Sequence, residues 1–373
     1  MPKILQVSTR HNVGGISKLI IELLGDSDFE QVYATGTCEN NEKEYSLELT
    51  SPSTSIYTFT RIRGLRRSIN FTNDVLALFS LIKVIRQEKP DIIHTHMSKA
   101  GLLGRVAARL SFSRVKTVHS YHGHVLDGYF NKVFAQIVIN FERILGRLTD
   151  GFVFDGNQTL HEINGYGIKP KKIQQVILPG LIKQVSANNQ NRVTGKKLQI
   201  LVVARIEKVK RIDLVLEVAR NLTKNYPTLN YEINIVGDGE LRQIFENQSS
   251  SESLPLKFKG WRDSVNDYYR EADLLLSTSD SEGTPLTFME AASFGCPIVS
   301  TNVGSVADLI EDKKTGILCA KNAEIIAAEI ANLWRNQALL EAFSRNTLAK
   351  ASNEFTADIF IKKHSELYKS LLP

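Results

Sequence analysis

The chain has 373 residues, of which 42% are hydrophobic and 23% are charged, a composition typical of a folded globular protein. This length predicts two domains, because a single domain usually holds ~100–200 residues. The three cysteines, Cys38, Cys296 and Cys319, are scattered along the chain. Their spacing excludes a disulfide framework and a zinc site built on cysteine pairs, and it favours a reducing compartment.

The net charge of +6 is unevenly distributed. The first 185 residues carry 23 Lys and Arg against 16 Asp and Glu, a net charge of +7, whereas the remainder carries 23 against 24, a net charge of −1. Part of the excess lies in the segment RIRGLRRSINF, which contains Arg61, Arg63, Arg66 and Arg67. These arginines either form a solvated surface or meet anionic lipid headgroups or an anionic acceptor. Nucleic acid is not an expected partner, because no basic motif interleaved with aromatic residues is found.

No part of the sequence is typical of a membrane-spanning segment or a secretory signal. Gln6 interrupts the apolar N-terminus, and Lys83 interrupts the apolar segment VLALFSLIKVI. A bilayer-spanning helix needs ~20 apolar residues, and no run approaches that length. We therefore expect a cytoplasmic protein, either free or peripheral at the inner face of the membrane.

Strand-like and helix-like segments alternate from the N-terminus onward. In the first half the expected strands are residues 3–8, 31–37, 55–60, 91–96, 115–123 and 151–156. The expected helices between them are residues 14–25, 73–90, 99–111 and 134–150. This alternation predicts an α/β fold with a parallel, doubly wound sheet in an N-terminal Rossmann-like domain of residues 1–183.

A polar stretch without periodicity, residues 184–197, is the expected linker, after which the alternation restarts. In the second half the expected strands are residues 198–205, 231–239, 256–261, 273–279 and 297–304, and the expected helices are residues 211–226, 240–248 and 264–272. A second Rossmann-like domain is therefore expected over residues 198–355, followed by an amphipathic helix within residues 356–373. Ligands of such sheets bind outside the carboxyl ends of the strands.

The segment SEGTPLTFMEAASF follows one of these strands and has the features of a helix start. Thr284 is expected to cap the helix, and Pro285 suits its first position. The backbone N–H groups of Leu286 and Thr287 would then point outward without intrahelical partners. Such a helix start at the carboxyl edge of a sheet suits a phosphate group.

Two glutamates flank this helix start. Glu282 lies in the turn before it, and Glu290 lies more than one turn inside the helix. A carboxylate accepts two hydrogen bonds at once, and vicinal hydroxyls of a ribose or a hexose offer two. One glutamate could hold the ribose and the other the sugar, with a diphosphate between them at the helix start. The segment therefore predicts a site for a nucleotide-sugar donor.

The same segment, SEGTPLTFMEAASFGCPIVSTNVGSVADLI, resembles the donor-site signature of retaining family-4 (group 1) glycosyltransferases with the GT-B fold. Other matching segments occur in the family's order, among them VGGISKLIIELL, TVHSYHGH, VARIEKVKRIDLVLEVA and IVGDGELR. The resemblance covers nearly the whole chain. It implies two Rossmann-like domains that face a central cleft, an acceptor-binding first domain, a donor-binding second domain and a last helix that crosses back to the first domain.

The resemblance also implies roles for individual residues. Arg205 and Lys210 match the arginine and lysine that hold the donor diphosphate in the family, although Lys208 is an alternative to Lys210. Two cations beside a helix start would stabilise a departing diphosphate. Gly14 and Gly15 match the family's glycine loop, in which missing side chains allow the backbone to approach a phosphate or a sugar.

The family places a histidine near the donor sugar at the end of the strand that carries HSYHGH. His122 is the first candidate for this role and His124 the second. Gly237, in VGDGELR, matches a strand-end glycine near the nucleotide, and Lys99, in SKAG, is a candidate for facing an anionic acceptor.

The expected activity is the transfer of a sugar, with retention of the anomeric configuration, to a saccharide or a polyprenyl-linked saccharide in a bacterial polysaccharide pathway. Glu282 would hold hydroxyls of the donor sugar. The family needs no metal and no cofactor, and UDP is its commonest carrier, with GDP as the alternative. Two other hypotheses stay open, namely a nucleotide-sugar epimerase of the same fold and a saccharide-binding subunit without activity.

Overall fold

A computed structural model describes residues 1–40, 42–45, 57–123, 132–180 and 197–373. The chain divides into two compact units, one of residues 1–181 together with residues 357–373 and one of residues 182–356. Apart from its last residue, the predicted linker of residues 184–197 lies outside the described residues. The last helix belongs to the first unit, as the resemblance implied.

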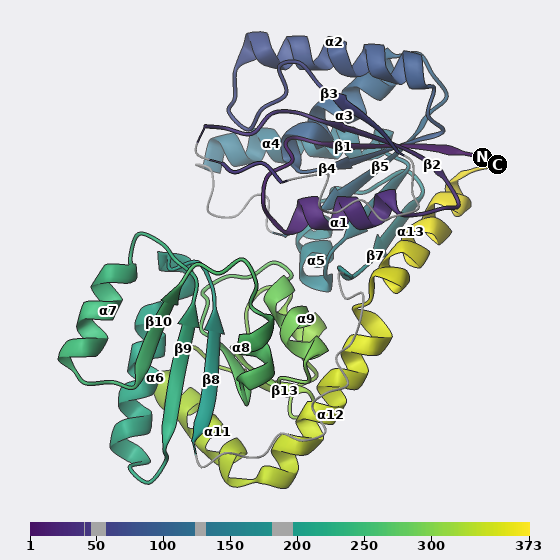
Figure 1. The fold of residues 1–373 in the computed structure, drawn as a ribbon. Helices are drawn as coiled ribbons and strands as arrows, with labels where there is room; N and C mark the ends of the chain where they lie inside the picture. The colour runs from purple at the N-terminus through teal and green to yellow at the C-terminus, as the bar shows by residue number, and fades with distance from the viewer. Residues whose placement is uncertain (41, 46–56, 124–131, 181–196) are drawn as a thin grey trace. The chain divides into compact units, whose positions relative to one another are not determined.

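The first unit is built on a parallel sheet of seven strands in the order β3-β2-β1-β4-β5-β6-β7 (Figure 1). The order reverses between β1 and β4, which is the arrangement of a Rossmann-like fold. The strands are β1 Lys3–Ser8, β2 Glu30–Thr35, β3 Tyr57–Arg61, β4 Ile92–His96, β5 Lys116–Tyr121, β6 Gly151–Phe154 and β7 Ile173–Val176.

Helices cover both faces of this sheet. Successive side chains of a strand point to opposite faces, and in a buried strand the apolar side chains on both faces need a helix to pack against. Leu5 of β1 packs against α2 and α3, whereas the neighbouring Ile4 packs against α1 and α13. Phe152 of β6 has the same orientation as Leu5 by strand register and packs against α4. The helices are α1 Gly15–Leu24, α2 Phe71–Glu88, α3 Ser98–Leu110, α4 Lys132–Leu148, α5 Asn157–Gly165 and α13 Ala357–Leu371.

The second unit repeats the plan with a parallel sheet of six strands in the order β10-β9-β8-β11-β12-β13 (Figure 1). Its strands are β8 Leu198–Val203, β9 Tyr231–Val236, β10 Leu256–Gly260, β11 Leu274–Ser277, β12 Ile298–Thr301 and β13 Gly316–Cys319. Its helices are the short η2 Lys208–Lys210, α6 Ile212–Asn225, α7 Arg242–Ser251, α8 Asn266–Glu271, α9 Leu286–Ser293, α10 Val306–Leu309, α11 Ala323–Arg335 and α12 Gln337–Glu354. The predicted fold class, two Rossmann-like domains with doubly wound parallel sheets, is confirmed.

The start of α9 corrects one detail of the prediction. Pro285, not Thr284, is the capping residue, because its backbone is still extended, with φ −70° and ψ 112°. Its carbonyl accepts the first bond of the helix from the Phe288 N–H at 3.1 Å, as a capping residue does. The helix therefore begins at Leu286, so the N–H groups of Leu286 and Thr287 belong to its first turn, as predicted.

None of the helices in the described part of the chain combines the length and the apolar character that a membrane-spanning segment needs.

Candidate functional site

A cavity of about 260 Å³ lies at the carboxyl edge of the sheet in the second unit. Its walls come from the ends of β8 and β11, from η2 and from the start of α9. Six residues of the predicted donor site line it together: Arg205, Lys210, Glu282, Pro285, Leu286 and Thr287. The predicted cations and the predicted phosphate-binding helix start therefore share one cavity.

Lys210 and Glu282 form an ion pair in this cavity. The Lys210 Nζ donates to both carboxylate oxygens of Glu282, at 2.7 Å and 2.9 Å. The Ser279 hydroxyl donates to the same carboxylate at 2.5 Å. Both partners are largely shielded, with 22% of the Lys210 side chain and 10% of the Glu282 side chain exposed. The ion pair therefore has a fixed geometry, and its two partners are not mobile surface side chains.

Arg205 lies at the rim of the cavity with a mostly exposed side chain, and it pairs with Glu207 at 2.9 Å. The loop that carries Lys210 is attached to the strand that leads to Glu282. The Thr278 hydroxyl donates to the carbonyl of Lys210 at 3.2 Å and to that of Arg211 at 2.9 Å. A hydroxyl at the end of β11 therefore fixes the position of the predicted phosphate-binding lysine.

Glu290 lies on the side of α9 that faces α8, outside the lining of the cavity described above. The hydroxyl of Tyr269, a residue of α8, donates to its carboxylate at 3.0 Å. Burial, with a further contribution from Glu290, raises the pKa of Tyr269 well above its ordinary value, so the phenol stays protonated and donates. Tyr269 is buried inside the unit, whereas Trp261 is 60% exposed.

At two positions near this edge the backbone packs so closely against another segment that only a glycine fits. Gly237 has φ 138°, and a Cβ built on it would lie 1.9 Å from the carbonyl oxygen of Ala204. Gly304 has φ 54°, and its Cβ would lie 1.7 Å from the carbonyl oxygen of Glu282. Neither position tolerates a side chain without a shift of backbone, and both support loops that line the cavity.

In the first unit, His122 directly follows β5 at the carboxyl edge of the sheet. Its Nε2 lies 3.1 Å from the Nδ1 of His96, the last residue of β4, and the two rings are stacked. Burial, with a smaller contribution from His364, lowers the pKa of His122 to about 4. The imidazole is therefore neutral near pH 7 and can accept or donate a hydrogen bond without carrying charge.

A buried hydrogen-bond chain connects His122 to the last helix. His96 Nε2 meets the Gln6 side-chain oxygen at 3.0 Å, and the Gln6 amide nitrogen donates to the Tyr368 hydroxyl at 3.3 Å. Tyr368 in turn lies 2.6 Å from His94 Nδ1. The predicted candidate His124 lies outside the described residues. Within the described residues, no group of three or more His, Cys, Asp or Glu side chains is arranged to hold a metal ion.

Two family models together match most of residues 31–350. The model described as Glycosyl transferases group 1 matches residues 185–350, and the model described as Glycosyltransferase Family 4 matches residues 31–180. The chain belongs to the group 1 and family 4 glycosyltransferases. This confirms the family that the sequence motifs resembled, and it makes the cavity at the start of α9 the candidate active-site region of a glycosyltransferase.

Relatives of this glycosyltransferase span most of its length. It is 29% identical over 318 residues to the UDP-Gal:alpha-D-GlcNAc-diphosphoundecaprenol alpha-1,3-galactosyltransferase of Escherichia coli, with 81% of each chain covered. It is 26% identical to the O-antigen biosynthesis glycosyltransferase WbnH of Escherichia coli, with 80% of this chain and 81% of the relative covered. Anabaena Alr3699/HepE, solved in complex with UDP, superposes with a TM-score of 0.79 at 16% identity, covering 99% of this chain and 100% of that one. That likeness shows the GT-B fold.

The glycine loop of the glycosyltransferase follows β1 as predicted. Gly14 caps α1 and Gly15 is its first residue. Gly14 has φ 173°, which any residue adopts, and among the described residues its Cβ would meet only the Asn12 side chain, at 3.8 Å. The described part of the protein therefore does not require a glycine at position 14.

Lys99 and the predicted arginines lie near the same carboxyl edge. The ammonium group of Lys99 pairs with Asp74 at 2.5 Å and donates to the Ser68 carbonyl, so its charge is already compensated. Arg61 pairs with Glu44 and donates to the Gly36 carbonyl at 2.7 Å. Arg63, Arg66 and Arg67 are exposed, and the guanidinium of Arg67 lies 3.8 Å from the carboxylate of Glu42.

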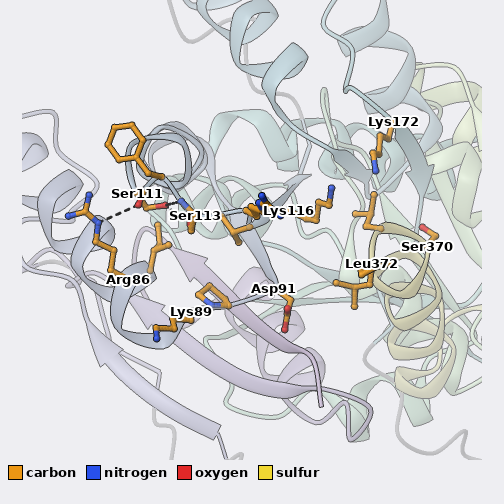
Figure 2. Close-up of a pocket in the computed structure, with 16 residues that line it drawn as sticks. Arg86, Lys89, Asp91, Ser111, Ser113, Lys116, Lys172, Ser370 and Leu372 are labelled. Atoms are coloured by element: carbon orange, nitrogen blue, oxygen red, sulfur yellow. Dashed lines mark hydrogen bonds between the residues drawn. The ribbon is translucent and has the colours of Figure 1, made fainter.

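A larger cavity of about 850 Å³ lies at the opposite, amino edge of the first sheet (Figure 2). Arg86 and Lys89 at the end of α2, Lys116 at the start of β5 and Lys172 before β7 contribute to its lining. Ligands of parallel α/β sheets bind at the carboxyl ends of the strands, so the smaller cavity in the second unit is the candidate functional site, although the cavity at the amino edge is larger.

Sequence reasoning missed the residues that position the predicted ones. Ser279, Thr278, Tyr269 and Gly304 hold Glu282, Lys210 and Glu290 in place. All of these contacts except that of Ser279 join segments that are distant in the sequence. Ser279 alone had a local signal, because it lies three residues before Glu282.

Proposed function

We propose that this glycosyltransferase transfers a sugar from a UDP-sugar to a saccharide or a lipid-linked saccharide, with retention of configuration and without a metal ion. The observation that carries the proposal is the single cavity in which Arg205, Lys210, Glu282 and the start of α9 meet. The UDP named for the Escherichia coli galactosyltransferase and for the Anabaena structure supports the choice of carrier.

In the proposed complex the donor diphosphate lies at the first turn of α9. Lys210, Arg205 and the N–H groups of Leu286 and Thr287 would stabilise the charge that develops on the departing phosphate. These cations supply the role that a divalent metal plays in other nucleotide-sugar enzymes, which is why we propose metal independence. Gly237, required by its contact with Ala204, keeps the end of β9 close to the bound nucleotide.

The glutamates would bind the two sugar rings of the donor. Glu290 would accept hydrogen bonds from the ribose hydroxyls, and Glu282 from hydroxyls of the transferred sugar. Glu282 must then share or release its bond to Lys210 when the diphosphate arrives. His122, neutral near pH 7, would contact the donor sugar, and Gly14 and Gly15 would let the backbone of the first unit approach it.

The proposed transfer step makes one bond at the anomeric carbon and breaks another. The bond between the anomeric carbon and the phosphate oxygen breaks, and a bond between that carbon and the acceptor oxygen forms on the same face. The acceptor hydroxyl gives its proton to the departing phosphate oxygen. An oxocarbenium-like state between the two events accounts for retention without a protein nucleophile.

Product analysis tests this proposal. The enzyme is incubated with a panel of UDP-sugars and GDP-sugars and with polyprenyl-diphosphate saccharides as acceptors, with and without EDTA, and the products are examined by NMR. We expect a glycoside with the anomeric configuration of the donor and no effect of EDTA. An inverted product, loss of activity in EDTA, or epimerised donor formed without acceptor would contradict the proposal.

A further inference from the structure

The outward side of α2 exposes an apolar stripe to solvent. The side chains of Ile69, Phe71 and Phe79 are 81%, 82% and 64% exposed, although residues of this kind are usually buried. Phe71, Val75 and Phe79 follow one another at four-residue spacing, so they lie on one side of the helix, and Leu76 adds to its edge. The opposite side, with Ala77, Leu81 and Ile85, packs on the sheet.

A second apolar stripe occurs on α4. Ile137, Phe141, Ile144 and Leu148 are each 40–59% exposed and recur every three or four residues along the helix. Both α2 and α4 cover the same face of the seven-stranded sheet, the face to which Leu5 and Phe152 point. The two stripes therefore lie on the same side of the first unit. We call the outward sides of α2 and α4, together with residues 63–70, the docking face.

Positive charge accompanies the apolar side chains. Residues 63–88 and 132–148, the segments that form the docking face, carry 8 Lys and Arg but only 3 Asp and Glu, a net charge of +5. Exposed cations flank the α2 stripe at both ends: Arg63, Arg66 and Arg67 before it, and Lys83 and Arg86 within its last turns. Figure 2 shows Arg86 and Lys89 at the end of α2.

We propose that the docking face binds an anionic lipid bilayer. Its apolar side chains would enter the boundary between headgroups and acyl chains, and its cations would meet the lipid phosphates. A second copy of the chain fits less well, because a symmetric dimer through this face would bring two positively charged surfaces together. The loop of residues 63–70 follows β3 at the carboxyl edge of the sheet, the edge that carries His122. A bilayer on this face therefore lies next to the edge of the first sheet that carries His122.

Vesicle binding in the absence of any donor tests this proposal separately from sugar transfer. The full-length protein is sedimented with vesicles of phosphatidylcholine alone or of phosphatidylcholine mixed with phosphatidylglycerol, at low salt and at about 0.5 M NaCl. We expect binding to the anionic vesicles that weakens strongly in high salt, and little binding to the neutral ones. Since a cation near an anionic surface strengthens binding about fivefold, Arg66→Glu/Arg67→Glu should weaken it at least about 25-fold.

The apolar contribution is tested by Phe71→Ser/Phe79→Ser and by Ile137→Ser/Phe141→Ser, each expected to weaken binding about tenfold or more. Matched controls lie in the second unit: Ile244→Ser removes an equally exposed apolar side chain, and Arg345→Glu reverses an exposed charge. Both controls should bind as the wild type does. All these positions are exposed, so the variants should retain the wild-type circular dichroism and UDP affinity.

Three results would overturn the proposal. These are a lack of binding to anionic vesicles, equal binding by the wild type and the docking-face variants, and a dimer in sedimentation velocity that Phe71→Ser/Phe79→Ser converts to monomer. The last result would assign the face to a second copy of the chain.

Discussion

The ammonium nitrogen of Lys210 lies 2.7 Å and 2.9 Å from the two carboxylate oxygens of Glu282, at the place where we propose the donor diphosphate to bind. A residue proposed to stabilise a leaving phosphate is thus paired, before the donor arrives, with a residue proposed to hold the donor sugar. Glu282 keeps the lysine in place, and the donor phosphate must then compete for the same ammonium group. The two residues should therefore behave as one energetic unit.

Replacing Lys210 should mainly slow the chemical step. We expect Lys210→Ala to lower kcat about 10²–10³-fold, because a cation aimed at the departing phosphate is lost. Glu282→Gln should also lower kcat, and the double variant should lose less than the product of the two single effects. Steady-state kinetics of the four proteins measures this. Lys314→Ala, which removes an exposed lysine paired with Glu311 at 2.6 Å, is the control. Additive effects of the two substitutions would contradict the idea of a single unit.

Replacing Glu290 should mainly weaken donor binding. In Glu290→Gln the side-chain oxygen can still accept the Tyr269 hydrogen bond, but the charge that strengthens hydrogen bonds to the ribose is lost. We expect the donor KM to rise about tenfold while kcat changes little. Tyr269→Phe keeps the packed ring and removes only the positioning contact, so its effect should be smaller. An unchanged donor KM in Glu290→Gln would remove this glutamate from the site.

Substitutions of three glycines test whether each glycine is needed for the fold or for binding of the donor. Gly304→Ala and Gly237→Ala should both lower the thermal unfolding temperature and weaken UDP binding, because their Cβ atoms would lie under 2 Å from backbone oxygens. Gly14→Ala should leave the unfolding temperature unchanged, since its Cβ would meet only the Asn12 side chain at 3.8 Å. If the Gly14 backbone approaches the donor, this variant still loses donor affinity. A stable Gly14→Ala variant with wild-type kinetics would place the donor elsewhere.

Secondary structure could be predicted from the sequence where it depends on the residues of a short segment. Alternating strands and helices, the strand of residues 3–8 and the position of Glu290 inside a helix were all confirmed, because hydrophobic periodicity and turn residues decide them locally. The cap of α9 was misplaced by one residue, because the fixed φ of a proline suits both the capping position and the first helical position, and only ψ separates them.

The contacts within the site could not be predicted from local pattern. Three kinds of contact join distant residues: the bond of Tyr269 to Glu290, the contact between Gly304 and the Glu282 carbonyl, and the chain from His122 through Gln6 to Tyr368. The residues that they join are 21 to 362 positions apart. The basic segment was noticed in the sequence, but the apolar stripe beside it was not, because exposure of a helix face depends on which side packs on the sheet.

Buried histidines should make the first unit sensitive to acid. Burial lowers the pKa of His11, His122 and His364 from the ordinary 6.5 to about 4, with Arg61 adding to the effect at His11. At pH values between about 4 and about 6.5 the unfolded chain binds more protons than the native protein does. The free energy of unfolding therefore falls as the pH decreases from about 6.5. A shift of this size corresponds to at most about 3 kcal/mol for each histidine.

Urea unfolding between about pH 7.5 and about pH 5 measures this loss. His364→Gln should reduce the change of stability with pH, because one of the groups that must stay neutral is removed. Exposed His161 offers the control, and His161→Gln should leave the pH dependence as it is in the wild type. A stability independent of pH over this range would show that these histidines bind protons as readily in the native protein as in the unfolded chain.

The most direct test of the donor site is a calorimetric titration of the protein with UDP, GDP and ADP, together with Glu290→Ala and Lys210→Ala variants. We predict that UDP binds more tightly than the other two nucleotides and that both substitutions weaken its binding. A folded protein that binds none of the three, or variants that bind UDP as the wild type does, would contradict a donor site at the start of α9.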